Sequence, residues 1–114
     1  MLRQMTARSE FLAANRGQRF PTPGFVLLVR PRGDDDAALG VGFTVSKKVG
    51  NAVTRNRMKR RLRALARAAV PARGVAGADH VFIGRHGGND IGFAELEKQL
   101  DGALARAAKK LGTP

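Results

Sequence analysis

The feature that most constrains this chain is a long basic segment without a single acid. No aspartate or glutamate occurs between Ala37 and Ala78, although the 114-residue chain contains nine acids and has a net charge of +12. The basic residues of this segment are Lys47, Lys48, Arg55, Arg57, Lys59, Arg60, Arg61, Arg63, Arg67 and Arg73. A solvated helix face normally mixes charges of both signs, so an ordinary surface helix explains this pattern poorly. The segregation indicates a polyanionic partner, either nucleic acid or an anionic membrane.

The centre of this segment has the periodicity of an amphipathic helix from Ala52 to about Val70, which Asn51 is suited to cap and Pro71 to end. At about 100° per residue, its apolar side chains form one narrow stripe that we expect to pack on a sheet. That stripe consists of Met58, Leu62, Leu65 and Ala69. The opposite side carries Asn56, Lys59, Arg60, Arg63 and Arg67, with Arg55, Arg57 and Arg61 at its borders.

The spacing of these cations favours RNA over a membrane. Like charges three or four residues apart repel by a few tenths of a kcal/mol per pair, and a polyanionic ligand would relieve that repulsion. Arginine outnumbers lysine, and planar guanidinium groups grip phosphates and stack on bases. A membrane-binding helix would need its apolar side chains exposed to lipid, whereas here the core requires them. Lys47 and Lys48 precede the positive end of the helix, where phosphates are also favoured.

The remaining pattern predicts a single small α+β domain with a mixed sheet over residues 1–114. Thr6 is suited to cap a first helix that runs to about Arg16. Strands are predicted over residues 25–29, 39–46 and 80–84, and a short extra strand near Arg19 and Phe20 is left open. A last helix begins at Phe93, and we expect residues 112–114 to fray. The leucines expected to bury one face of this last helix are Leu96, Leu100, Leu104 and Leu111.

The strand over residues 39–46 alternates between apolar and small or polar side chains. One face, expected to be core, consists of Leu39, Val41, Phe43 and Val45. The other face consists of Gly40, Gly42, Thr44 and Ser46. Because these side chains are small, we expect this second face to be low and flat, and able to admit a chain lying across it.

The run from Ser46 to Arg63, with Arg-Asn-Arg at residues 55–57, resembles the signature of the bacterial ribonuclease P protein. Residues 8–11, followed by Gly17, resemble the first helix of that family. Residues 25–27 resemble its first long strand, and residues 41–45 resemble the strand that leads into the signature. The resemblance covers essentially the whole chain.

The resemblance implies a fold similar to the ribosomal-protein S5 domain 2-like folds, with a left-handed β-α-β crossover around the basic helix. It implies that the chain is the protein subunit of ribonuclease P, which binds a catalytic RNA and the 5′ leader of precursor tRNA and assists endonucleolytic removal of that leader. The RNA subunit and its Mg²⁺ ions would perform the hydrolysis. We therefore expect no catalytic residue, tightly bound metal or obligate protein partner, and a cytoplasmic location without membrane attachment.

The resemblance also suggests two groups of site residues. The residues that match the RNA-binding motif are Lys47, Lys48, Arg55, Asn56, Arg57, Lys59, Arg60 and Arg63, and the helix wheel adds Arg67. In the family, the leader crosses a cleft between the first helix and the sheet that is partly lined by aromatic rings. The expected cleft residues here are Phe11, Asn15, Leu28, Thr44 and Ser46. Since the chain has no Tyr or Trp, we expect its leader binding to use less base stacking and more phosphate contact than in many relatives. The alternative for Phe11 is that it belongs to the core and does not contact the leader.

Two other classes of function are open to a basic chain of this size. A ribosomal or RNA-chaperone protein would use a similar basic helix structurally, without a role in tRNA processing. A protein-only nuclease would need clustered carboxylates with a matched acid and base. His80 and His86 lie on a predicted strand and in a glycine turn, and the three aspartates from Asp34 to Asp36 are expected to form a solvated turn.

Overall fold

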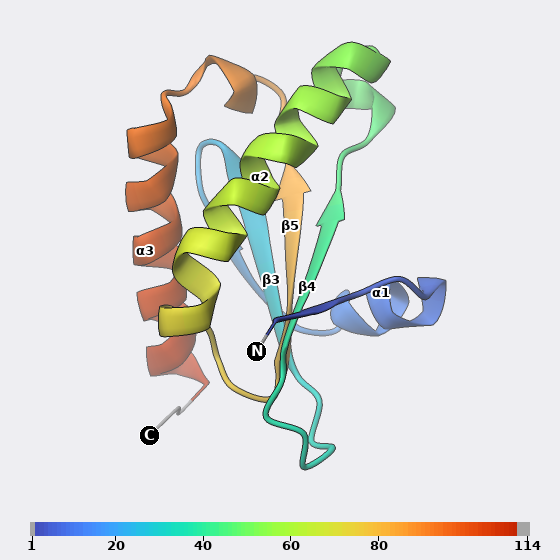
Figure 1. Ribbon diagram of the computed structural model, residues 1–114, viewed down its shortest axis with the longest axis vertical. Coiled ribbons are helices and arrows are strands. Elements are labelled where there is room, and N and C mark those ends of the chain that lie inside the picture. The colour runs from blue at the N-terminus through green and yellow to red at the C-terminus, as the bar shows by residue number, and fades with distance from the viewer. Residues whose placement is uncertain (1, 112–114) are drawn as a thin grey trace.

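The strands form one five-stranded mixed sheet that helices cover on both faces (Figure 1). The computed structural model describes residues 2–111. In chain order, the elements are β1 (Leu2–Gln4), α1 (Arg8–Ala14), β2 (Gln18–Pro21), β3 (Phe25–Pro31), β4 (Leu39–Thr44), the 3₁₀ turn η1 (Lys47–Val49), α2 (Ala52–Arg73), β5 (Ala78–Gly84), the 3₁₀ turn η2 (Gly88–Asp90) and α3 (Phe93–Lys110). The strand order is β1-β4-β5-β3-β2; β4 is parallel to β1 and β5, and β3 is antiparallel to β5 and β2.

The alternation of side chains along β3 divides the interior into two cores. Phe25, Leu27 and Val29 join the larger cluster, which includes the buried side chains of α2 and α3. Val26 and Leu28 point to the other face and pack in a smaller cluster with residues of α1. The sheet therefore separates a face covered by α2 and α3 from a face covered by α1.

Helix α2 follows the predicted wheel, with a broader buried stripe. Met58, Leu62 and Leu65 are buried as predicted. Ala69 is only partly buried, and the stripe extends to Ala66 and Val70, which are fully buried. The buried stripe thus extends from Met58 to Val70.

The predicted start of α2 is confirmed, whereas its predicted end is wrong. The Asn51 side chain accepts a hydrogen bond from the Thr54 N–H at 2.9 Å, as expected of a cap. Pro71 lies inside the helix, which continues to Arg73. A proline so close to the end removes one backbone donor, and the Gly74 N–H still closes the last turn by donating to the Val70 carbonyl at 2.8 Å.

The connection from β4 through α2 to β5 is a left-handed crossover, as the family resemblance implies. In Figure 1, α2 lies in front of the sheet and both strands run upward, and the chain passes from β4 to β5 on its left. General topology rules favour the right-handed arrangement by a wide margin, so residue patterns alone did not predict this feature.

The N-terminal region differs from the prediction. Leu2–Gln4 forms strand β1, which pairs in parallel with β4 and was not predicted. Thr6 does not cap α1; the N-cap is Ala7, which has no capping side chain. The Glu10 carboxylate caps from inside the helix instead and accepts hydrogen bonds from the Ala7 N–H at 3.0 Å and the Thr6 N–H at 3.3 Å. The Ala7 hydrogen bond lowers the pKa of Glu10.

The other bounds differ by a few residues. The short extra strand near Arg19 and Phe20 is present as β2. Strand β3 continues to Pro31, past its predicted end, whereas β4 ends at Thr44, two residues before its predicted end. Helix α1 ends at Ala14, and β5 begins at Ala78. Leu96, Leu100 and Leu104 of α3 are buried as predicted, with Leu111 partly buried. The predicted fraying of residues 112–114 lies outside the described residues.

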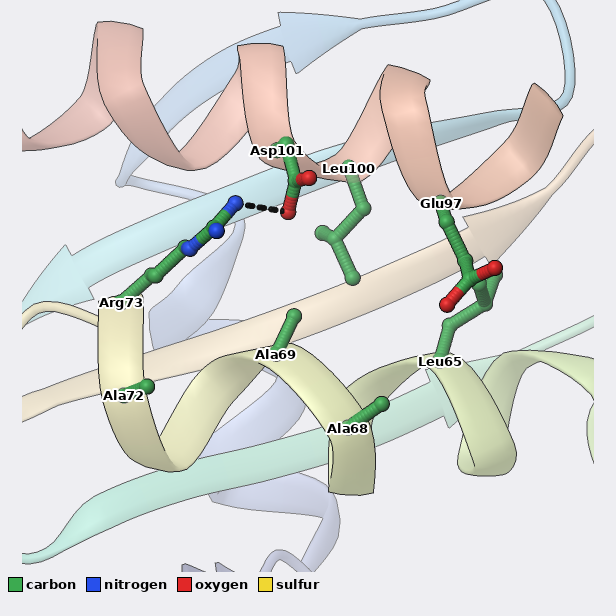
Figure 2. A pocket seen from close by; sticks show the side chains of 8 residues that line it. All are labelled: Leu65, Ala68, Ala69, Ala72, Arg73, Glu97, Leu100 and Asp101. Carbon is green, nitrogen blue, oxygen red and sulfur yellow. Dashed lines mark ion pairs between the residues drawn. The ribbon is translucent and has the colours of Figure 1, made fainter. Parts of the chain in front are cut away.

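The two helices on the larger core enclose a shallow hollow of about 230 Å³ near the C-terminal end of α2 (Figure 2). Ala68, Ala69 and Ala72 form the α2 side, and Leu100 lies opposite them on α3. The ion pair between Arg73 Nη1 and Asp101 Oδ1, at 2.6 Å, joins the helices at one end. Arg73 is thereby paired with an acid, whereas the arginines earlier in α2 have no such partner among residues 2–111.

The loop between β3 and β4 is organised by Arg32, whose side chain is almost fully buried. Its guanidinium donates to Asp79 of β5 and to Asp34 of the loop, each at 2.9 Å. Asp34 and Asp36 also accept hydrogen bonds from backbone N–H groups two residues ahead. The acidic cluster therefore forms a turn, as predicted from its sequence.

His80 is completely buried in the centre of the sheet. Its Nε2 accepts a hydrogen bond from the Val75 N–H at 3.0 Å, and its Nδ1 lies 3.0 Å from the Gly40 carbonyl oxygen. These partners require the neutral imidazole with its proton on Nδ1. Burial lowers the pKa of His80.

We predict that this histidine makes the protein less stable in mild acid. In the unfolded chain His80 takes up a proton near pH 6.5, while the folded state resists protonation down to its lower pKa. The unfolded state therefore binds more protons below about pH 6.5, and the free energy of unfolding falls by up to about 1.4 kcal/mol per pH unit until the folded-state pKa is reached.

Urea denaturation of the wild type and a His80→Asn variant between pH 8 and pH 5 tests this prediction. The asparagine amide retains a donor for Gly40 and does not titrate. The variant should be less stable at pH 8, since the Val75 N–H loses its acceptor, and should lose less stability on acidification. Parallel pH profiles for the two proteins would contradict the prediction.

Candidate RNA-binding surface

Most cations of α2 lie on the solvent-exposed side of the helix. The exposed residues are Asn56, Arg57, Arg60, Arg63 and Arg67, and Lys59 is half-buried beside them. Lys47 and Lys48 are exposed in η1, directly before the helix. Within residues 2–111, the ion pairs to carboxylates involve Arg3, Arg32 and Arg73. No cation between Lys47 and Arg67 is neutralised in this way, so the surface keeps its charge for a ligand.

A tight turn links the lysines to the helix. Gly50 has a φ of 150°, and a Cβ atom added there would lie 2.9 Å from Thr54 Cγ2. Only glycine therefore fits between η1 and the Asn51 cap. This turn places Lys47 and Lys48 beside the N-terminus of α2, whose backbone dipole adds to the positive potential.

Arg55, like Arg61, is less exposed than the other arginines of α2. It is half-buried, and its Nε is fully buried without a hydrogen-bond partner among the described residues. An unpaired buried donor is normally costly. The structure thus places this residue of the signature beneath the exposed surface, at its border.

Arg61 joins α2 to the segment before α3. Its guanidinium donates to the Gly88 carbonyl oxygen at 3.1 Å and makes a shorter hydrogen bond to the Ile91 carbonyl. Burial lowers the pKa of Arg61, and the charge of Arg57 contributes to this shift. Two of its donors are thus used within the protein, which the sequence pattern did not reveal.

Arg63 is held by an aromatic ring. Its Cζ lies 5.9 Å from the centroid of the Phe43 ring, within the range of a cation–π interaction. Phe43 in turn stacks on the buried Phe82, with ring centroids 5.5 Å apart. The ring limits the freedom of a long side chain on the exposed surface, and so reduces the entropy cost when that side chain binds a phosphate.

A second candidate surface lies on the opposite face of the sheet. Three of the predicted cleft residues line one hollow of about 240 Å³: Phe11 of α1, Asn15 at the C-cap of α1, and Thr44 of β4. The other lining residues are Arg8, Leu12, Val81 and Ile83. Sequence reasoning missed Arg8 and Leu12, although Arg8, Phe11, Leu12 and Asn15 have the i, i+3, i+4, i+7 spacing of one helix face.

The other two predicted cleft residues lie elsewhere. Leu28 is only 1% exposed and packs beneath α1 with Met5 and Ala14. Ser46 is exposed after the end of β4 and does not line the hollow. The predicted low face of β4 is also not open at Gly42, because a Cβ atom there would lie 2.7 Å from Phe11 Cε1. Helix α1 occupies this space.

The two histidines have no catalytic arrangement around them. His80 uses both ring nitrogens on backbone groups, and His86 is exposed in the turn after β5. Within the part of the chain that the structure describes, no three His, Asp or Glu side chains cluster as metal ligands. No helix among residues 2–111 has the length and apolar content needed to cross a bilayer.

Comparisons with known proteins identify the family to which this chain is similar. The family model described as Ribonuclease P matches residues 2–108. The ribonuclease P protein component of Erythrobacter litoralis is 50% identical over 107 residues, which cover 94% of this chain and 87% of that protein. The ribonuclease P protein component of Gluconacetobacter diazotrophicus is 46% identical over 105 residues, with coverage of 91% and 90%.

Solved structures show the same fold. The ribonuclease P protein of Staphylococcus aureus superposes with a TM-score of 0.76 at 25% identity, covering 91% of this chain and 94% of that one. The ribonuclease P protein of Thermotoga maritima gives a TM-score of 0.71 at 28% identity, with coverage of 87% and 91%. With its basic helix, its left-handed crossover and these relatives, the chain belongs to the family of ribonuclease P protein components.

Proposed function

We propose that this chain is the protein subunit of a ribonuclease P ribonucleoprotein, in which it binds the catalytic RNA and assists removal of the 5′ leader from precursor tRNA. The observation that carries the proposal is the exposed face of α2, whose cations have no carboxylate partner within the described residues. A face of this kind in a member of the ribonuclease P protein family is best explained as the contact with that RNA.

The proposed contact with the catalytic RNA is mainly electrostatic. Each arginine that meets a phosphate releases a condensed counterion, so affinity should fall steeply with salt. Arg60, Arg63 and Arg67 lie on successive turns of one helix face and can follow a phosphate backbone. The lysines of η1 extend the same surface past the helix N-terminus.

The proposed leader site is the hollow between α1 and the sheet. Phe11 offers a ring on which a base can stack, Arg8 offers a cation for a phosphate, and Asn15 and Thr44 offer hydrogen-bonding groups. Since this hollow contains a single ring, stacking should contribute less than the polar and phosphate contacts. The sheet separates this site from α2, so the protein can contact two RNA molecules at once.

The proposal assigns hydrolysis of the phosphodiester to the RNA subunit with its Mg²⁺ ions. The placement of His80 and His86 supports this assignment, because neither is oriented by an acid toward a surface hollow. The contribution of this chain is then to hold the leader and to neutralise phosphates where two polyanions approach each other. That neutralisation would lower the Mg²⁺ concentration needed for cleavage.

The direct test is cleavage of precursor tRNA by the cognate catalytic RNA at low Mg²⁺ concentration, with and without the protein. We expect the protein to accelerate cleavage and to shift the Mg²⁺ requirement to lower concentration. No acceleration at any protein concentration would refute the proposed function.

We predict that Arg60→Ala or Arg63→Ala will weaken binding to the catalytic RNA and flatten its salt dependence. The slope of log K against log salt should decrease by about one for each arginine–phosphate pair that the substitution removes. The measurement is filter binding over a series of salt concentrations. Arg73→Ala is the matched control, because that arginine is paired with Asp101, and it should leave the slope unchanged. An unchanged slope for Arg60→Ala would remove that residue from the interface.

We also predict that Phe11→Ala will weaken binding of precursor tRNA to the holoenzyme more than binding of mature tRNA. Removing the ring beneath a stacked base costs about 1–3 kcal/mol, and only the precursor has a leader that can stack there. Leu28→Ala is the control, since it should destabilise the core beneath the same helix by about 2–5 kcal/mol without changing the surface of the hollow. Affinities measured well below the unfolding temperature of each variant distinguish these roles. Equal losses of affinity for precursor and mature tRNA with Phe11→Ala would assign this ring to the core alone.

A further inference from the structure

A third hollow, of about 420 Å³, lies between α2 and the start of α3. Its lining residues are Arg57, Arg60, Arg61, Ala64 and Phe93. Arg60 belongs to the proposed RNA-binding face, whereas Phe93 comes from a different helix. The hollow therefore extends the cationic surface of α2 sideways, toward α3, and adds an aromatic ring to it.

Phe93 is unusually exposed for an aromatic residue. It is the first residue of α3, and its exposed fraction is 38%. Among residues 2–111, the only other large hydrophobic residues with comparable exposure are Leu12 and Val53. Leu12 lines the proposed leader site, and Val53 lies in the first turn of α2. An apolar ring exposed beside three arginines indicates a ligand with both an apolar face and a negative charge.

The three arginines differ in how free they are to bind. Arg61 donates to the carbonyls of Gly88 and Ile91 and so fixes the segment before Phe93 against α2. Arg57 and Arg60 are exposed and form no ion pair within the described residues. Asp90 and Glu95, the acids nearest to Phe93 in sequence, do not line the hollow. The guanidinium groups of Arg57 and Arg60 are thus available to a ligand, while Arg61 fixes the segment that leads to Phe93.

We propose that this hollow binds an unpaired nucleotide of the RNA subunit, with its base stacked on Phe93 and its phosphate between Arg57 and Arg60. This inference rests on the proposed function. Stacking on an aromatic ring beside cations that hold the backbone is the usual way in which proteins bind single-stranded nucleic acid. An acidic peptide would use the arginines and leave the ring without a matching partner.

The position of the hollow identifies which RNA supplies the nucleotide. It lies on the side of the sheet that carries α2 and α3, next to the arginines proposed to grip the catalytic RNA. The proposed leader site lies on the opposite side, beneath α1. A nucleotide that reaches Phe93 therefore belongs to the RNA bound along α2, and not to the leader.

A fluorescence experiment tests this directly, because the chain contains no Trp or Tyr. A Phe93→Trp variant has one indole, whose emission should be quenched when the catalytic RNA binds, since a stacked base quenches it. A Leu12→Trp variant is the matched reporter for the other face. Its emission should change little with the catalytic RNA and should respond when precursor tRNA with a leader is added.

Affinity measurements separate stacking from charge. Phe93→Leu keeps an apolar side chain and should weaken binding of the catalytic RNA by about fivefold or more without changing the salt slope. Arg57→Ala should instead reduce the slope by about one. Val53→Ala removes another exposed apolar side chain, which does not line the hollow, and should bind the RNA as the wild type does.

The outcomes distinguish this inference from the function on which it rests. If the variants bind the catalytic RNA but the emission of Phe93→Trp is unchanged, or Phe93→Leu binds like the wild type, the nucleotide site is refuted and the proposed function stands. Quenching of Phe93→Trp only after addition of a leader-bearing precursor tRNA would also refute the assignment to the RNA subunit. If the wild type fails to bind the catalytic RNA at all, both the function and the site are refuted.

Discussion

The structure depends on the burial of one apolar stripe along α2. Met58, Leu62, Leu65, Ala66 and Val70 anchor the helix to the sheet. Burial of each large side chain contributes about 1.5–3 kcal/mol, whereas each pair of neighbouring cations on the exposed side costs a few tenths. The difference in magnitude explains how so many unneutralised charges can be kept on one rigid helix. Without that stripe, no comparable burial would hold the helix on the sheet and offset the repulsion between its cations.

Strand β4 allows the two faces of the sheet to carry different sites. Its alternate side chains point toward α2 on one face and toward α1 on the other. On the α2 face, Phe43 supports Arg63 through a cation–π contact. On the α1 face, the missing side chain of Gly42 allows the Phe11 ring to approach the backbone. Two neighbouring residues thus position parts of two separate surfaces, which are held at a constant distance because the sheet between them is rigid.

Local patterns predicted the elements whose signals are strong within a short window. The amphipathic stripes of α2 and α3, the Asn51 cap and the alternation of β4 were all found in this way. Strand β1 was missed because its pairing with β4 joins residues nearly forty positions apart, and its three residues have no periodicity of their own. Pro71 was misjudged because a proline in the last turn removes a single hydrogen bond. The handedness of the crossover came only from the family resemblance. In the site, the wheel identified the exposed arginines, but the anchoring of Arg61, the burial of Leu28 and the contribution of Phe93 depend on contacts between distant segments.

The acidic turn held by Arg32 has a consequence for the way the protein meets its partner. This turn lies at one end of the longest axis of the molecule, which extends 39 Å, while η1 and the N-terminus of α2 lie at the other end (Figure 1). The cations of η1 and the start of α2 are therefore concentrated at one end, whereas the other end carries the acidic turn together with the basic last turns of α2 and α3. This uneven distribution of charge favours approach of the N-terminal end of α2 toward a polyanion before any contact forms. Such orientation during diffusion increases the fraction of productive encounters at low ionic strength. The buried ion pair between Arg32 and Asp79 keeps the acidic turn in place, away from that end.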